Sequence, residues 1–348
     1  MKNRLLALSA LLGTLGGGPF GSAARAQVEW ERGTLEENLA RAHRERKWVL
    51  VELATGWCES CRTMDAEVYQ RPEVGAKLAK DFIALRRDGE SGEGLALHDR
   101  YHVVGFPTLL VLSPEGGEID RIMGVVAAKE LIATLGSFRA GKNTLATLER
   151  RAADTHGSPE LVFELAKRHA LRGDGRAPGE VERVVANDPG HAAEALFTLG
   201  KYYYLRGVKQ YENAARTLER VIAVYPKSPQ ADEAPYDLAL ARHGLGDDGG
   251  AIKILDAWLA AAPDDLERQN AFAWGCFKSG FGRDRAIAVA REGLAAHPTS
   301  DPLWDTLAEL LFAEGRAAEA SAAEGKALAI KPADRYYTTQ LERMKGAH

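Results

Sequence analysis

Two cysteines separated by two residues, Cys58 and Cys61, are the side chains of this chain best suited to chemistry. Residues 47–53 are apolar and rich in β-favouring types, which predicts a buried strand, and residues 62–69 have helical character. Cys58 is therefore expected at or just before a helix's first turn, where unpaired N–H groups and the helix dipole stabilise an anion. A thiolate is such an anion, and it is the nucleophile of disulfide exchange. Cys61 follows one helical turn later, close enough to form a disulfide with Cys58.

Other uses of a Cys-x-x-Cys pair fit the sequence less well. A c-type haem requires His after the second cysteine, and Arg62 stands there. A tetrahedral zinc site requires four ligands, but the third cysteine, Cys276, lies in a different domain and no His pair has zinc-finger spacing. A purely structural disulfide closing so short a loop would stabilise little. The pattern favours a redox dithiol, with no metal and no further cofactor.

Length and composition describe the protein that must position this pair. At 348 residues the chain is too long for one ordinary core, which suggests two or three domains. With 45% hydrophobic and 27% charged residues it has the composition of a soluble globular protein rather than a disordered one. Lys and Arg total 45 against 49 Asp and Glu, and this net charge of -4 argues against nucleic acid as a partner.

A second motif lies downstream of the cysteines. Residues 101–108 read Tyr-His-Val-Val-Gly-Phe-Pro-Thr and precede an expected strand at 109–112, a turn at 113–117 and a second strand at 118–123. Together with the Trp-Cys-Glu-Ser-Cys motif, this resembles the thioredoxin superfamily. The similarity covers about residues 28–140. It is greatest to exported thioredoxin-like proteins and to the C-terminal thioredoxin module of the transmembrane reductant DsbD. The resemblance implies an α/β thioredoxin fold, a central mixed sheet flanked by helices.

The resemblance also implies roles for individual residues. Cys58 would be the attacking nucleophile and Cys61 the resolving thiol. Pro107 would be a cis-proline facing the dithiol, since a cis turn lets the preceding backbone pair with an incoming peptide. Phe106 and Thr108 would border that peptide contact. Trp57 would cover the dithiol, which is compatible with an ordinary packing role.

An acidic residue stands six positions before Cys58. At the position of Glu52 the family keeps a buried acid that accepts the proton of the resolving thiol; the alternative is a partly solvated carboxylate at a strand end. The lysine that pairs with this acid in thioredoxin corresponds to Ala84, so a relay through Glu52 depends on whether Arg86 or Arg87 can replace it. The redox direction also stays open. Glu59 disfavours a thiolate on Cys58, Arg62 favours one, and the resemblance favours a reductase or an interchange enzyme.

The C-terminal half of the chain is repetitive. Prolines recur 34 to 37 residues apart, each with an alanine twelve residues before it and an aliphatic residue four before it. The prolines are Pro189, Pro226, Pro263, Pro298 and Pro332, and the alanines are Ala177, Ala214, Ala251, Ala286 and Ala320. The small alanines let two helices approach closely, and the proline ends the second helix of each pair. The region therefore resembles a tetratricopeptide (TPR) array of about five repeats.

Such an array forms an all-α solenoid whose concave groove takes peptides or protein surfaces. Tyr202 to Tyr204 and Arg206 are possible groove residues, in a unit that carries a two-residue insertion between its helices. Three consecutive tyrosines on one helix cannot all face the same way, however, so at least one belongs to the core. Cys276 is expected to be an inert buried thiol. The predicted domains are residues 27–140, thioredoxin-like; 141–157, a linker in which a helix can begin; and 158–348, the TPR array with a closing helix.

The first 26 residues have the pattern of a cleaved signal peptide. Lys2 and Arg4 precede an apolar run over residues 5–15, and Ala24-Arg25-Ala26 forms a cleavage signal. The apolar run is shorter than the ~18–20 residues of a membrane anchor, which is the alternative interpretation. No cysteine lies near the cleavage point, which argues against a lipoprotein. We expect an exported protein of a bacterial periplasm.

The leading functional hypothesis is a periplasmic thiol–disulfide oxidoreductase that acts on protein cysteines. Its expected partners are a thiol–disulfide donor or acceptor protein, such as a membrane reductant of DsbD type, and a peptide or protein held in the TPR groove. The alternative is a chaperone-like holdase or scaffold, because the domain order resembles a cytoplasmic thioredoxin–TPR co-chaperone. That family has no signal peptide and can lack one motif cysteine. No constellation of residues supports a small-molecule enzyme.

Overall fold

The computed structural model describes residues 27–155 and 157–346, so the predicted signal peptide lies outside the described residues. The first domain is built on a four-stranded mixed sheet with strand order β2-β1-β3-β4. The central strand β1 (Trp48–Ala54) runs parallel to β2 (Phe82–Asp88) and antiparallel to β3 (Thr108–Leu112), which in turn pairs antiparallel with β4 (Glu118–Met123). The predicted thioredoxin fold class is confirmed.

Alternate residues of β1 point into two apolar cores, one on each face of the sheet. Val49, Val51 and Leu53 pack on the face covered by α1 (Leu35–Glu45) and α4 (Gly92–Arg100). Leu50 packs on the other face, against the π-helical segment η1 (Met64–Val68), α3 (Pro72–Asp81) and α5 (Ala128–Arg139). Because side chains alternate along a strand, Glu52 shares the face of Leu50 and points into the core beneath η1.

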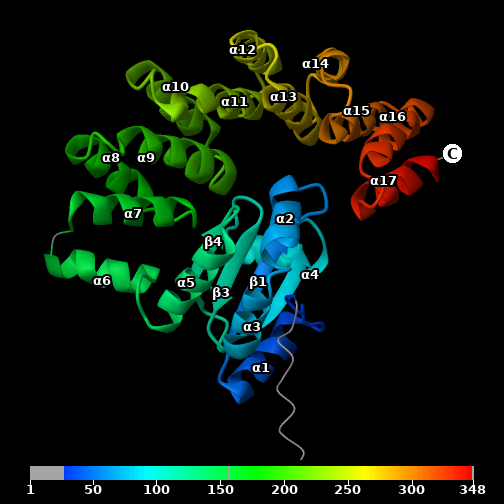
Figure 1. Cartoon of the computed structure of the whole chain (residues 1–348). Coiled ribbons are helices and arrows are strands. Elements are labelled where there is room, and N and C mark those ends of the chain that lie inside the picture. The colour runs from blue at the N-terminus through cyan, green and yellow to red at the C-terminus, as the bar shows by residue number, and fades with distance from the viewer. Residues whose placement is uncertain (1–26, 156, 347–348) are drawn as a thin grey trace, which may run out of the picture.

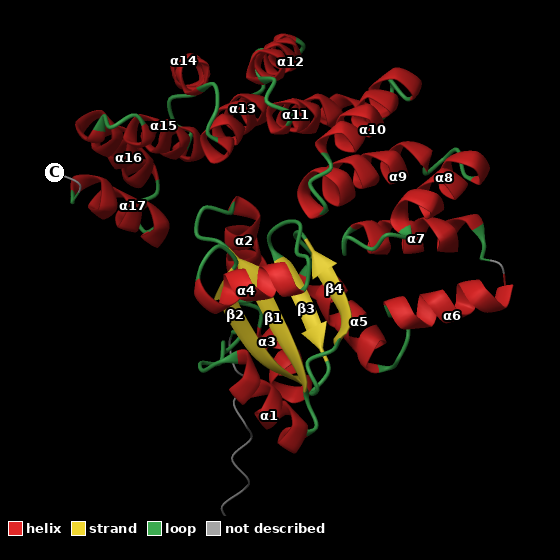
Figure 2. Ribbon diagram, turned by 180° about the vertical axis from the view of Figure 1, so that it is seen from behind, coloured by secondary structure: helices red, strands yellow, loops and turns green. Residues whose placement is uncertain are grey.

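The rest of the described chain is helical and resembles TPR proteins, as expected. After α6 (Leu145–Thr155), helices follow one another in antiparallel pairs that curve around one end of the sheet (Figures 1 and 2). The pairs are α7 (Pro159–Ala170) with α8 (Ala177–Asn187), α9 (Ala192–Thr198) and η2 (Leu199–Gly207) with α10 (Tyr211–Val224), α11 (Pro229–Gly244) with α12 (Asp248–Ala260), α13 (Leu266–Ser279) with α14 (Arg283–Ala296), and α15 (Asp301–Ala313) with α16 (Ala317–Ile330), followed by α17 (Arg335–Lys345).

The proline and alanine pattern has a direct structural basis. The second helix of each pair ends two or three residues before its proline, because proline lacks an N–H and clashes with the preceding turn. The five alanines twelve positions earlier are completely buried, so a larger side chain would separate the paired helices. Among the described residues, no helix is long and apolar enough to cross a membrane.

Two segments differ from simple repeat geometry. Residues 145–155, within the expected linker, form α6, whose Leu148 packs on Leu161 and Leu165 of α7. The segment around the three tyrosines is the π-helical η2, at the repeat for which the sequence carries two extra residues. A π-helix takes one more residue per hydrogen-bonded turn, which accommodates such an insertion. Tyr203 is the tyrosine that enters the core.

The array is anchored to the sheet by a buried charged cluster. Asp120 of β4 is completely buried and forms ion pairs with Arg168 and Arg172, at the end of α7 and just after it. Arg172 also pairs with Glu118 at 3.0 Å, and Arg121 donates a hydrogen bond to the carbonyl of Leu171. These contacts fix the start of the array on the edge strand, so the later helices can arch over the end of the sheet where α2 lies (Figures 1 and 2).

Candidate active site

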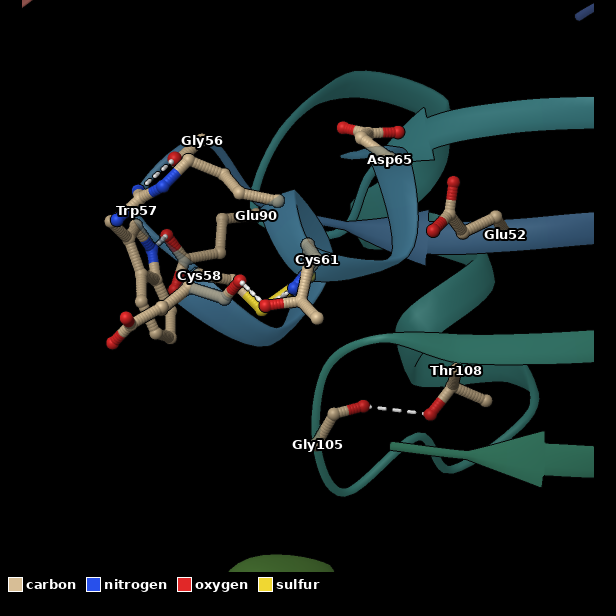
Figure 3. Close-up of a disulfide and its surroundings, with 12 residues drawn as sticks. Glu52, Gly56, Trp57, Cys58, Cys61, Asp65, Glu90, Gly105 and Thr108 are labelled. Carbon is tan, nitrogen blue, oxygen red and sulfur yellow. Dashed lines mark hydrogen bonds between the residues drawn. A yellow bond between two sulfur atoms is a disulfide. The ribbon is translucent and has the colours of Figure 1, made fainter. Parts of the chain in front are cut away.

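The cysteine pair lies at the carboxyl end of β1, where the chain turns into helix α2 (Glu59–Thr63) (Figure 3). Cys58 is the N-cap of α2 and forms a disulfide with Cys61, with 5.2 Å between their Cα atoms. The backbone N–H of Cys61 donates to Sγ of Cys58 at 3.1 Å. This N–H and the helix dipole are the groups that would stabilise a thiolate on Cys58 in the reduced protein. Cys58 is 5% exposed and Cys61 1%, so Cys58 is the more accessible sulfur.

The loop before β3 forms the opposite side of the site. The Phe106–Pro107 peptide bond is cis, and Phe106 packs on the apolar cluster of Ala54, Cys58 and Cys61. Thr108 is buried as the first residue of β3, and its hydroxyl donates to the carbonyl of Gly105 at 2.7 Å (Figure 3). The Thr108 hydroxyl therefore already donates its hydrogen bond within the loop. Contact of Phe106 and Thr108 with a substrate remains a prediction.

Glu52 is completely buried on β1, which removes the alternative of a solvated carboxylate. The Tyr69 hydroxyl donates to its Oε1 at 2.9 Å, and Nε of Arg86 lies 3.1 Å from its Oε2. Arg86 stands directly opposite Glu52 in the β1–β2 register. It also forms an ion pair with Asp65, whose side chain lies near that of Glu52 (Figure 3). Arg86, and not Arg87, is therefore the cation beside Glu52, and it pairs with this acid as the lysine does in thioredoxin.

The electrostatics of Glu52 follow from its surroundings. Burial raises the pKa of this carboxyl to about 7, because desolvation outweighs the opposing effects of the Arg86 guanidinium and the Tyr69 hydroxyl. Asp65 adds a smaller repulsion in the same direction as burial. A carboxyl with a pKa near neutrality can both accept and release a proton, which is the property a relay needs.

Trp57 contacts the helical array as well as its own domain, which no local sequence pattern indicates. Its ring Nε1 donates to Glu90 at 2.9 Å, and its ring lies 6.2 Å from that of Phe106. On the other side, its ring centroid lies 5.4 Å from that of Trp274 on α13. The ammonium of Lys278, on the same helix, lies 4.8 Å from the Trp57 ring and 2.9 Å from Glu90. The array is therefore in direct contact with the residue that precedes Cys58.

The last helix closes a second contact at the site. Arg62 of α2 lies over the rings of Tyr336 and Tyr337 at 5.6 and 5.7 Å, and its Nε is 3.9 Å from Asp334. A Cβ on Gly56 would lie only 3.2 Å from the Tyr336 ring, so α17 packs closely against the turn that holds the cysteines. These contacts join residues more than 270 positions apart, which local sequence patterns do not indicate.

Among the described residues, no group of three or more His, Cys, Asp or Glu side chains could hold a metal ion. Cys276 is completely buried on α13, and burial raises the pKa of its thiol to about 12. A thiol in that environment stays protonated near neutral pH and is a poor nucleophile.

Comparison with known proteins identifies the first domain. The sequence model of a thioredoxin-like family matches residues 29–114. The thiol:disulfide interchange protein DsbD 2 of Pseudomonas aeruginosa is 37% identical over 103 residues, which cover 28% of this chain and 17% of the relative. A protein disulfide-isomerase of Schizosaccharomyces pombe is 36% identical over 84 residues, covering 24% and 21%. The chain thus spans about a fifth of these relatives' length.

Solved structures resemble the two parts of the chain separately. A solution structure from Bacteroides thetaiotaomicron, described as a candidate disulphide-isomerase, has 30% identity and a TM-score of 0.31, covering 33% of this chain and 96% of that one. A thermophilic TPR protein of Thermus thermophilus has 21% identity and a TM-score of 0.38, covering 54% and 99%. The chain contains a thioredoxin-like domain that is similar in sequence to domains of thiol:disulfide interchange proteins, followed by a helical region that resembles TPR proteins.

Proposed function

We propose that this protein is a thiol–disulfide oxidoreductase that acts on cysteines of other proteins. The observation that carries the proposal is the arrangement of one disulfide-forming pair at a helix start, with the cis Phe106–Pro107 loop packed beside it. The names of its thioredoxin-like relatives support the same chemistry.

In the reducing direction, the Cys58 thiolate attacks one sulfur of a client disulfide and displaces the other as a thiolate. The Cys61 thiolate then attacks the Cys58 sulfur of this mixed disulfide, which closes the Cys58–Cys61 bond and releases the second client thiolate. Two electrons pass from the protein to the client, and the two client thiolates take up protons. Glu52 accepts the proton that Cys61 loses. After this reducing direction a donor of DsbD type would reduce the Cys58–Cys61 disulfide again. Run backwards, the same steps oxidise a client dithiol and leave Cys58 and Cys61 reduced.

The helical array lies on two sides of the dithiol, so a client that reaches Cys58 would also contact the array. Trp274 contacts Trp57 on one side. On the other, a Cβ added to Gly105 would lie 3.8 Å from the Arg206 guanidinium on η2. A client would therefore meet the array and the dithiol together, which supports a role for the array in binding protein partners.

The test of the chemistry is turnover of a protein disulfide by the full chain. With dithiothreitol as the reductant, the wild-type protein should accelerate the reduction of insulin disulfides. Replacing both cysteines (Cys58→Ser with Cys61→Ser) should bring the rate back to the uncatalysed value. The matched control is Cys276→Ala, which removes the buried thiol and should leave turnover unchanged. Equal turnover by the double variant and the wild type would overturn the proposal.

The proposed compartment is the bacterial periplasm, supported by residues 1–26 and by the similarity to DsbD proteins. Expression of the full chain in a Gram-negative host should yield a product in the periplasmic fraction that begins at Gln27. A product that stays in the cytoplasm with its first residues intact would contradict this.

A further inference from the structure

A small cavity opens where the array meets the active-site helix. Its volume is about 170 Å³, and it lies between α2 on one side and α13 and α15 on the other. Trp57 and Glu59, the residues immediately before and after Cys58, line the first wall. Trp274 and Asp305 belong to the second wall. We call this space the tryptophan cavity. A client segment whose cysteine has reached Cys58 would place a neighbouring side chain at its mouth.

The aromatic part of the cavity is suited to a cation. The Trp57 and Trp274 rings lie 5.4 Å apart, and indole faces attract ammonium and guanidinium groups. The chain's own Lys278 demonstrates the interaction at the edge of this pair, with its ammonium 4.8 Å from the Trp57 ring. That lysine is neutralised by Glu90 at 2.9 Å, so it does not supply a free positive charge to the cavity.

One carboxylate oxygen in the wall of the cavity lacks a hydrogen-bond partner among the described residues. Asp305 is only 6% exposed, it lines the cavity, and its Oδ1 has no hydrogen-bond partner among the described residues. Behind it, Glu324 of α16 is completely buried, and its carboxyl forms a hydrogen bond with that of Asp305. Burial raises the pKa of both carboxyls. Glu309 raises the pKa of Asp305 further and Asp305 raises that of Glu324, whereas the hydrogen bond with Glu324 lowers the pKa of Asp305. Buried polar atoms in native proteins are nearly always hydrogen-bonded, so Oδ1 of Asp305, which this contact leaves without a partner among the described residues, points to a missing donor.

The neighbouring arginines are already engaged. Arg343 pairs with Glu309, the third acid of this group, at 2.5 Å. Arg62 donates to the carbonyl of Gly56 at 3.1 Å and lies over two tyrosine rings of α17. The cavity therefore keeps an excess of acidic over basic groups, although no group of acids among the described residues is arranged to hold a metal ion.

We propose that the tryptophan cavity binds a lysine or arginine side chain of the client, next to the cysteine that Cys58 attacks. This specificity rests on the proposed oxidoreductase function. The cationic head would donate to Oδ1 of Asp305, and its aliphatic stem would lie along the two indole rings. An acidic side chain would be repelled by the carboxylate, and a neutral amide could donate only a weaker hydrogen bond without balancing its charge, so clients with basic residues beside their disulfides are preferred.

The experiment compares disulfide-bonded peptides that differ only in the residue beside one cysteine, which is Arg, Lys, Gln or Glu. The second-order rate constant for reduction by the reduced full-length protein is measured for each. We expect the Arg and Lys peptides to react at least tenfold faster than the Gln peptide. Asp305→Asn should bring this ratio close to one. Asp256→Asn should keep the wild-type ratio, since it removes an equal charge from a different cavity, between α12 and α14.

A second variant avoids relying on one buried substitution. Asn270→Lys adds a cation to the same cavity wall and should compete with the client's basic residue, so it too should reduce the ratio. Equal rates for all peptides with the wild-type protein would overturn the proposal. So would a wild-type preference that survives both Asp305→Asn and Asn270→Lys.

A binding measurement separates this proposal from the proposed chemistry. Peptides with Ser in place of Cys are titrated into the Cys58→Ser/Cys61→Ser protein, with tryptophan fluorescence as the readout. Tighter binding of the Arg peptide than of the Gln peptide, lost in Asp305→Asn, supports the cavity even if the wild-type protein reduces no disulfide. Equal binding of both peptides refutes the cavity even if the protein is an active oxidoreductase.

Discussion

Glu52 should lower the stability of the folded protein above neutral pH, and Glu52→Gln should relieve this cost. The glutamine can still accept from Tyr69, and Arg86 keeps its ion pair with Asp65. The variant differs chiefly in that it cannot ionise. The wild-type carboxyl has a pKa of about 7 in the fold, against an ordinary value of 4.5 in the unfolded chain.

The size and sign of the effect follow from proton linkage. Because the folded state holds this proton more tightly, its contribution to stability is fully present below pH 4.5. It is lost between about pH 4.5 and 7 and stays lost above that range. A separation of about 2.5 pH units, at about 1.4 kcal/mol each, corresponds to about 3 kcal/mol. The free energy of unfolding of Glu52→Gln minus that of the wild type should therefore rise by about 3 kcal/mol between pH 4.5 and pH 8.

The assay is urea unfolding of the oxidised full-length protein at several pH values, followed by tryptophan fluorescence. Comparison at equal pH cancels the contribution of the array, which is identical in both proteins. Glu73→Gln, on the exposed start of α3, is the matched control for loss of a carboxylate, and we expect a flat difference for it. A difference for Glu52→Gln that is equally flat from pH 4.5 to pH 8 would refute the assigned electrostatics.

Three further substitutions test the packing and charge arguments. Asp120→Ala should destabilise the protein by about 3–5 kcal/mol, because it leaves the partly buried Arg168 and Arg172 without the completely buried carboxylate that they share; urea unfolding measures this, and a loss below 1 kcal/mol would contradict it. Ala251→Leu should cost about 1–3 kcal/mol by overpacking two helices, and an unchanged melting temperature would show that the site has room. Arg86→Met should destabilise more at pH 8 than at pH 5, since the buried glutamate loses its cation when it ionises; equal losses at both values would argue against that ion pair.

Much of the fold could be predicted because its signals are local. The strand expected over residues 47–53 is β1, and the one expected over 118–123 is β4. The prolines mark helix ends because their effect acts within one helical turn, and the alanines are buried because close helix packing requires small side chains. The placement of Cys58 at a helix start also follows from its immediate neighbours.

Features of the site that depend on register or on distant contacts could not be predicted. Arg86 reaches Glu52 because the parallel pairing of β1 and β2 sets the two residues opposite each other. The lysine that pairs with this acid in thioredoxin corresponds instead to Ala84, which lies two residues before Arg86 on β2. The contact of Trp274 with Trp57 depends on the curvature of the whole array, which the period of the repeat does not specify.

The most direct test of the central claim is the rate at which each cysteine of the reduced protein reacts with iodoacetamide, measured against pH by peptide mass spectrometry. We expect Cys58 to be alkylated first, with half-maximal reactivity at a pH below the pKa of about 8.5 of a free thiol, while Cys61 and Cys276 stay protected in the folded protein. Slower labelling of Cys58 than of Cys61, or half-maximal reactivity of Cys58 at or above that of a free thiol, would contradict the claim.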